Sequence, residues 1–145
     1  MNHIQIAILE IGKEEIPRGS NWGVNCQKYL ASVGITFPAS WCMAFVYWCC
    51  LQENNHNHLV KTGGVLAQWN GIDPKYKHTT PMAGDIFIMD FGSGHGHTGF
   101  VEAVEGDIIH TIEGNSNADG SREGYEVCRK PGGRKISSIK GFIRL

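Results

Sequence analysis

The sequence predicts an α+β fold in which N-terminal helices pack on an antiparallel sheet of about five strands. Two observations lead to this prediction. Apolar residues recur with helical spacing in the first half of the 145-residue chain, whereas short apolar runs separated by glycine-rich breaks make up the second half. The length is that of one domain and no linker or repeat divides it, so we expect residues 1–145 to form a single domain.

Four helices are expected in the first half. Two are indicated by apolar residues spaced three, four and seven positions apart, and each pattern is followed by a glycine that favours helix termination, Gly12 or Gly34. A third helix is expected over about residues 41–52, with Ser40 placed to cap its first turn, and a short fourth over Val65–Trp69. The apolar positions are Ile4, Ala7, Ile8 and Ile11, and then Cys26, Tyr29, Leu30 and Val33.

The expected strands of the second half are short and end at turn-forming residues. Runs rich in isoleucine, valine and phenylalanine alternate with Gly-Ser-Gly, Glu-Gly-Asp and Pro-Gly-Gly segments, which favour turns. Consecutive strands joined by such breaks form an antiparallel meander. The five expected strands are Gly84–Phe91, His97–Val104, Asp107–Asn115, Tyr125–Lys130 and Ile136–Leu145.

The charge balance argues against several classes of partner. Thirteen Lys and Arg residues face 14 Asp and Glu residues, which gives a net charge of −1. Proteins that neutralise phosphates usually carry a basic excess, so neither nucleic acid nor an anionic membrane surface is an expected partner. The longest near-apolar run, Trp41–Leu51, is too short to span a bilayer. The N-terminus lacks the basic segment of a signal peptide, so we expect synthesis in a cytoplasm.

Cysteine usage points to reduced thiols and to one reactive candidate. There are five cysteines, an odd number without a regular spacing, which is not typical of a disulfide scaffold. Cys42 falls in the first turn of the expected third helix, where free N–H groups and the helix dipole favour a thiolate. The alternative is a buried thiol, which is the expected role of Cys49 on the same face of that helix.

A histidine with the surroundings of a general base follows the Gly-Ser-Gly break. His97 opens an expected strand, so a rigid backbone lies behind it and a glycine loop beside it. The alternative is a solvent-exposed loop histidine. His95 and His97, like His56 and His58, also form an HxH pair, but zinc requires three or four ligands and the spacing indicates no third. We therefore assign no metal.

Glu113 and Asn115 are candidates to orient that imidazole, since an acid or amide beside a histidine fixes its tautomer. A two-residue turn at 105–106 would place His97 opposite Gly114 and away from both. A three-residue loop, or a bulge, would place His97 opposite Asn115 and Gly99 opposite Glu113, with the polar side chains on one face. The catalytic interpretation therefore predicts an odd loop or a bulge. The alternative is that Glu113 is an ordinary charge at a strand end.

Together these segments resemble the CHAP family of cysteine, histidine-dependent amidohydrolases and peptidases, within the papain-like NlpC-type superfamily. The resemblance covers most of the chain and includes the phage-associated or effector branch. The segments that carry it are Trp41–Val46, Gly84–Ile86, Gly96–Val101 and Ile112–Asn115, with Glu10–Gly12 and Tyr29–Leu30 in the helical front.

The resemblance implies a papain-like CHAP fold and a set of roles. Cys42 would be the nucleophile, His97 the base and Glu113 the group that orients it, while Asn115 would be a second orienting group or an aid to the oxyanion. The implied substrate is peptidoglycan, cut at the muramoyl–peptide amide or within a stem or cross-bridge peptide. The implied chemistry needs no cofactor. No acidic calcium loop of the DxDxDG kind is present.

Weaker candidates concern substrate binding and biology. Trp41, Trp22 and Asn21 are expected to line a groove for glycan or peptide, the alternative for the tryptophans being the core. Competing functions are an inactive CHAP-like module that binds wall peptides or a partner, a cysteine peptidase or deamidase acting on proteins, and a zinc protein. We expect a monomer that acts in the periplasm or cell wall after non-Sec delivery. The expected lack of a signal peptide favours a phage lysin or an injected toxin, which would need an immunity or delivery protein, over the third alternative, a cell's own remodelling enzyme.

Overall fold

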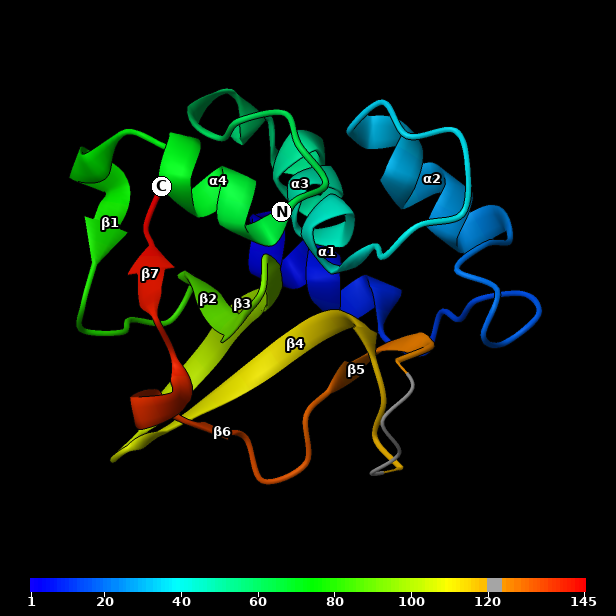
Figure 1. Ribbon diagram of the computed structural model, residues 1–145. Helices are drawn as coiled ribbons and strands as arrows, with labels where there is room; N and C mark the ends of the chain where they lie inside the picture. Colours follow the sequence, from blue (N-terminus) through cyan, green and yellow to red (C-terminus); the bar gives the residue numbers. More distant parts are fainter. Residues whose placement is uncertain (120–123) are drawn as a thin grey trace.

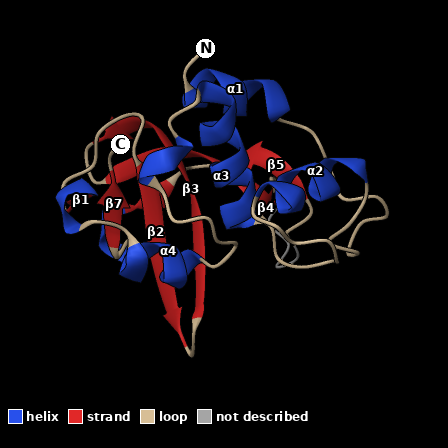
Figure 2. Ribbon diagram, turned by 90° about the horizontal axis from the view of Figure 1, so that it is seen from above, coloured by secondary structure: helices blue, strands red, loops and turns tan. Residues whose placement is uncertain are grey.

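The computed structural model describes residues 1–119 and 124–145, and its helices lie over one face of an antiparallel sheet (Figure 1). This arrangement confirms the α+β prediction. The central helix contacts two neighbouring strands of the sheet, and the two N-terminal helices pack on that helix. The fourth helix lies over the second and third strands, which are neighbours in the middle of the sheet (Figure 2).

Each expected helix is present with slightly different ends. Asn2 begins the first helix with a reciprocal capping box to Gln5, and this cap satisfies backbone groups of the first turn. The third helix is capped differently from the expectation, because its N-cap residue is Trp41 and makes no side-chain cap bond, so Ser40 does not cap it. The helices are α1 (His3–Glu10), α2 (Val24–Ser32), α3 (Cys42–Glu53) and α4 (Val65–Gly71), with short 3-10 turns η1 (His56–His58), η2 (Pro74–Tyr76) and η3 (Ile136–Ser138).

The described sheet has seven strands, two more than expected. Their order is β1-β7-β2-β3-β4-β5, and β6 pairs with β4 beside this path. The additional strands, β1 and β6, have two residues each, which is too short to produce a periodic pattern in the sequence. The last expected strand is interrupted by η3. The strands are β1 (Lys77–His78), β2 (Ile86–Gly92), β3 (His95–Glu105), β4 (Ile108–Ser116), β5 (Glu126–Arg129), β6 (Arg134–Lys135) and β7 (Gly141–Ile143).

The β3–β4 hairpin contains the bulge that the catalytic interpretation predicts. The turn itself has two residues, 106 and 107, so the three-residue loop is not formed. The register instead shifts at Glu102, which has no partner on β4. Beyond that bulge the register brings Gly99 opposite Glu113. The pairs are Glu105 with Ile108 at the turn, Ala103 with His110 before the bulge, and Phe100 with Ile112 beyond it.

Helix α3 is pressed closely against β4, which fixes where its first residue lies. A Cβ atom at Gly114 would lie only 2.8 Å from the Cβ of Phe45, so glycine at this position permits the contact. Phe45 is fully buried and stacks edge-on against Phe100 of β3, with ring centroids 6.2 Å apart. Consequently the N-terminal end of α3 stands above β3 and β4. Among the described residues, no helix is both long and apolar enough to cross a membrane.

Candidate active site

Cys42 is the first residue of α3 and is 5% exposed. N–H groups in the first turn of a helix have no partner within the helix, and the dipole places positive potential there. Both effects favour an anionic sulfur and a developing oxyanion at this point. A hollow of about 160 Å³ opens beside the residue, and its wall includes Ser40, Gly64, Gly94 and His95. We call it the Cys42 hollow.

His97 on β3 connects Cys42 to Glu113. Its Nε2 lies 2.9 Å from Glu113 Oε1, and its imidazole interacts with the Cys42 side chain closely enough to raise the pKa of His97. Because Nε2 is engaged by Glu113, Nδ1 is the ring nitrogen left available for the cysteine. Burial lowers the pKa of His97, but the hydrogen bonds and charges of Cys42 and Glu113 outweigh it and raise the pKa to about 9. The imidazolium is therefore the favoured form at neutral pH, which is the form that pairs with a thiolate.

Glu113 is completely buried and receives five hydrogen bonds. Arg134 donates two of them in a bidentate pair, from Nε at 2.6 Å and Nη2 at 2.7 Å. The hydroxyls of Thr111 and Ser116 donate two more, at 2.6 and 3.0 Å, and His97 completes the set. Burial raises the pKa of Glu113, but Arg134 and His97 outweigh burial and hold the pKa below its usual range. The carboxylate is therefore ionised beneath His97.

Sequence reasoning did not identify Arg134, Thr111 or Ser116. Arg134 lies on the two-residue strand β6, twenty-one positions after the carboxylate that it binds, and no local spacing links the two. The sequence contains only an indirect indication of these residues. An acidic side chain within the buried part of a strand requires a cation or several hydrogen-bond donors, and Glu113 therefore predicts that an Arg or Lys elsewhere in the chain lies beside it.

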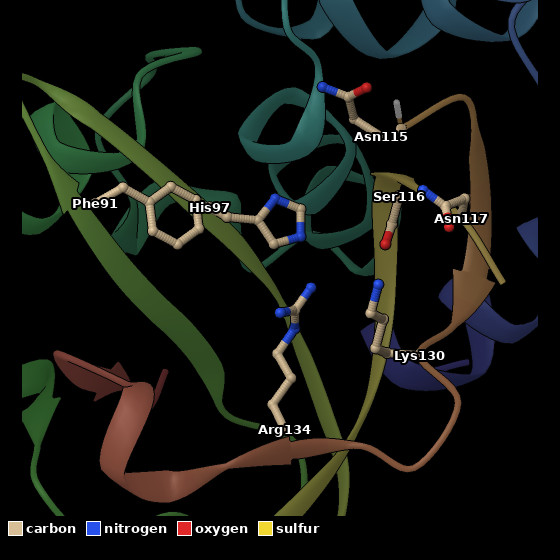
Figure 3. A pocket seen from close by; sticks show the side chains of 8 residues that line it. Phe91, His97, Asn115, Ser116, Asn117, Lys130 and Arg134 are labelled. Atoms are coloured by element: carbon tan, nitrogen blue, oxygen red, sulfur yellow. The ribbon is translucent and has the colours of Figure 1, made fainter. Parts of the chain in front are cut away.

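Asn115 also lies at the site, but not against the imidazole. Its backbone has a φ of 54°, which interrupts the strand alternation, so Ser116 rather than Asn115 reaches the Glu113 carboxylate. Within the described residues, the Asn115 side chain makes no hydrogen bond to His97. It borders a cavity of about 190 Å³ beside that histidine (Figure 3). We call this the His97 cavity. Of the two candidates for orienting His97, the geometry therefore favours Glu113.

The expected substrate-binding residues are not placed as predicted. Trp41 is fully buried and stacks on Tyr29, with ring centroids 5.5 Å apart, so its predicted contact with substrate is wrong and it belongs to the core. Asn21 and Trp22 are partly exposed in the loop before α2. Neither is among the residues that border the two hollows at Cys42 and His97. For these two residues a substrate contact stays a prediction.

The remaining cysteines have surroundings that suppress reactivity. All five cysteines are unpaired. Burial raises the pKa of Cys26 to about 12 and that of Cys128 to about 11, and it raises the pKa values of Cys49 and Cys50 well above the usual range. Thiols with such pKa values are poor nucleophiles at neutral pH. Cys42 is the cysteine that has both a hollow and a histidine beside it.

The histidine pairs do not form a metal site in the part of the chain that the structure describes. No group of three or more His, Cys, Asp or Glu side chains there is arranged to hold an ion. His97 is engaged by Glu113, and Nδ1 of His58 lies 2.9 Å from the Tyr76 hydroxyl. The zinc alternative therefore lacks a ligand set within residues 1–119 and 124–145.

A comparison with protein families agrees with this geometry. The family model of the CHAP domain matches residues 32–115, which is more than half of the chain and includes Cys42, His97 and Glu113. This chain belongs to the CHAP domain family. Searches of curated proteins and of solved structures gave no match. CHAP domains are generally amidohydrolase or peptidase domains, so the fold and family place the protein in that class of hydrolase. Arg134 lies beyond the matched residues.

Proposed function

We propose that this CHAP protein is a peptidoglycan hydrolase that cleaves an amide bond through a cysteine thioester. The bond is the muramoyl–peptide amide or an amide within a stem or cross-bridge peptide, and the working site is the periplasm or cell wall. One observation carries the chemical part of the proposal. His97 forms a hydrogen bond with an ionised Glu113 and interacts with Cys42, the first residue of α3. The family supports the class of substrate.

The first step is attack by the Cys42 thiolate on the amide carbonyl carbon. The new carbon–sulfur bond forms as the carbonyl electron pair moves to oxygen. The backbone N–H of Cys42, at the start of α3, is available to hold that oxyanion. One such donor typically contributes about 3–4 kcal/mol to transition-state stabilisation.

Collapse of the intermediate expels the amine. The carbon–nitrogen bond breaks as the His97 imidazolium donates its proton to the leaving nitrogen, which gives a free amine and a thioester on Cys42. The neutral imidazole then removes a proton from water, which attacks the thioester. The products are a carboxylic acid and the regenerated thiolate–imidazolium pair. Glu113 keeps the ring oriented throughout, because its own hydrogen bonds to Arg134 fix it in place.

The shape of the site is compatible with a peptide-like chain that passes over Cys42 and His97. The Cys42 hollow borders the cysteine and measures about 160 Å³, and the His97 cavity borders the imidazole and measures about 190 Å³. The rim of the cavity carries Phe91, a residue that is 63% exposed (Figure 3). An exposed aromatic face beside polar groups suits stacking on a sugar or on an apolar peptide side chain.

The test is digestion of purified peptidoglycan by the wild-type protein and by Cys42→Ala, with products identified by mass spectrometry. We expect soluble fragments from the wild type alone, and their new amine and carboxyl ends name the bond. Cys26→Ala is the matched control, because this cysteine is also buried but lies outside the site, and we expect it to retain activity. Equal release by Cys42→Ala would remove Cys42 from the mechanism. No release from several wall chemotypes would contradict the proposed substrate.

A thiol assay separates hydrolysis of the wall from the competing functions. An inactive binding module has no need of a reactive cysteine, so slow alkylation of Cys42 at neutral pH would favour that alternative. Rapid alkylation together with cleavage of purified proteins, and no release from wall material, would favour a protein peptidase or deamidase.

A further inference from the structure

The two hollows at the site border different members of the catalytic pair. The His97 cavity is bordered by the imidazole and not by the cysteine, whereas the Cys42 hollow is bordered by the cysteine and not by the imidazole. In thioester chemistry the acyl half of the substrate stays on sulfur, and the leaving amine takes a proton from the histidine. The half that leaves with the amine therefore belongs in the His97 cavity.

The wall of this cavity carries a cation that forms no ion pair with any residue that the structure describes. Lys130 is half-buried and its ammonium points toward Ser116 and into the space below His97 (Figure 3). Within residues 1–119 and 124–145 it makes no ion pair. Arg134, the other cation of the wall, has its charge matched by Glu113 in a bidentate pair. The two cations therefore differ in role.

The described residues that line the cavity with Lys130 do not supply a matching negative charge. None of the described residues that border the His97 cavity is a carboxylate. Glu113 lies beneath them with no exposed surface, and its oxygens are already engaged by five hydrogen bonds. A half-buried ammonium loses part of its hydration, and an anionic ligand replaces that hydration more strongly than a neutral one. A carboxylate on the substrate is the chemically matched occupant.

We propose that Lys130 binds a free carboxylate on the amine-side half of the substrate. This inference deepens the proposed function and rests on it for the identity of the substrate. It specifies an amide whose leaving amine belongs to a peptide with an acidic group near the new amino terminus. A stem peptide meets this description, because it contains glutamyl and, in many walls, diaminopimelyl carboxylates. Amidation of those carboxylates would remove the recognised group.

A binding experiment tests Lys130 independently of catalysis. The ligands are the tripeptide L-alanyl-γ-D-glutamyl-diaminopimelate and its fully amidated form, titrated into Cys42→Ala protein and followed by NMR or calorimetry. We expect the acidic tripeptide to bind about fivefold to tenfold more tightly than the amide. Lys130→Gln, added to Cys42→Ala, should abolish that preference. Equal affinities, or no binding of either peptide at millimolar concentration, would overturn the inference.

Lys135→Gln is the matched control. This lysine follows Arg134 on β6, is exposed, and does not border the cavity. We expect it to keep the preference for the acidic tripeptide. A loss of preference equal to that of Lys130→Gln would show a general charge effect and would overturn a specific site at Lys130.

Kinetics on wall fragments separates this inference from the proposed function. With fragments that retain their carboxylates, Lys130→Gln should raise KM about fivefold and leave kcat within about twofold, since Lys130 binds substrate without touching the reacting atoms. With amidated fragments the variant and the wild type should not differ. If the wild type and Lys130→Gln turn over the acidic fragments with the same KM, the role of Lys130 is overturned and the proposed function is not. Absence of turnover by the wild type counts against the proposed function, while the binding titration still decides the role of Lys130.

Discussion

Replacement of Arg134 by methionine should weaken the fold and the orientation of His97 together. Methionine retains an unbranched apolar stem of similar reach but removes both hydrogen bonds to Glu113. The carboxylate then remains fully buried with three of its five hydrogen bonds, those from Thr111, Ser116 and His97. A buried charge that loses its main partner is destabilising, because water does not replace the lost donors.

The expected magnitude follows from the contacts that are lost. Hydrogen bonds to charged groups contribute about 1.5–3 kcal/mol each, and removing one partner of a buried ion pair costs about 3–5 kcal/mol. The Arg134 side chain is 18% exposed, so some solvent reaches the pair and the lower end applies. We expect a loss of about 3 kcal/mol in the free energy of unfolding. For a domain of this size that loss lowers Tm by about 6–12 °C.

Urea denaturation followed by circular dichroism measures this loss, and the chain offers a matched control. Arg129 forms a second bidentate pair, with Glu102 at 2.7 and 2.8 Å, but its side chain is 52% exposed. Exposed pairs contribute about 0–1 kcal/mol, so Arg129→Met should change the unfolding free energy by less than about 1 kcal/mol. Equal losses in the two variants would refute the reasoning from burial.

The pH dependence of the Arg134→Met effect provides a second check. The pKa of Glu113 is lower in the folded protein than in the unfolded chain. Its stabilising contribution is therefore present above the unfolded pKa, about 4.3, and is lost as pH falls below it. The stability difference between wild type and variant should accordingly be complete at pH 7 and should shrink on acidification below about pH 4. A difference that stays constant with pH would show that Arg134 acts through packing and not through the carboxylate.

Three further predictions concern the catalytic residues. At pH 7 iodoacetamide should rapidly modify one thiol per chain in the wild type and none in Cys42→Ala, because burial raises the pKa of the other four cysteines. Rapid modification of a second thiol would contradict this prediction. The value of kcat/KM should fall as pH rises through about 9, where His97 loses its proton. Glu113→Gln should move this fall to lower pH, because Glu113 raises the pKa of His97. A pH profile that does not move would contradict this effect of Glu113 on His97. Gly99→Ala should cost about 1–3 kcal/mol of stability in urea, since its Cβ would lie 2.8 Å from the backbone oxygen of Ile112 and 2.9 Å from Glu113 Cγ. A neutral effect would show that the two strands can shift apart to admit the methyl group.

The sequence predicted best those features that depend on local spacing or on a short motif. Four helices and the longer strands follow from periodicity, and the family motifs singled out Cys42, His97 and Glu113 before any contact was known. The hairpin register is a sharper case. A requirement that His97 and Glu113 share a face predicted an irregularity in the hairpin, and the structure has a bulge at Glu102. Placing the extra residue in the turn was equally consistent with the sequence.

What sequence reasoning missed depends on contacts between distant segments. Nothing near Arg134 marks it as the partner of a carboxylate on another strand, and a two-residue strand leaves no periodic pattern. Trp41 was misjudged because a tryptophan beside a nucleophile fits a groove and a core equally well, and only packing against Tyr29 decides between them. The role of Lys130 is visible only once the cavity is known, because a solvated surface lysine has the same local sequence features.

The row of ionisable groups from Arg134 to Cys42 explains why a buried catalytic pair is tolerated. In the resting state that the proposed mechanism requires, a thiolate at Cys42 would complete a row of alternating charges with Arg134, Glu113 and His97, and these charges would sum to zero. After acylation His97 has given its proton to the amine and the sulfur is a neutral thioester, so the sum is again zero. Without Arg134 both states would carry a net negative charge in a poorly hydrated site, which costs free energy at every step. Arg134 therefore balances the charge of Glu113 through the whole cycle, which leaves the proton of His97 free to move.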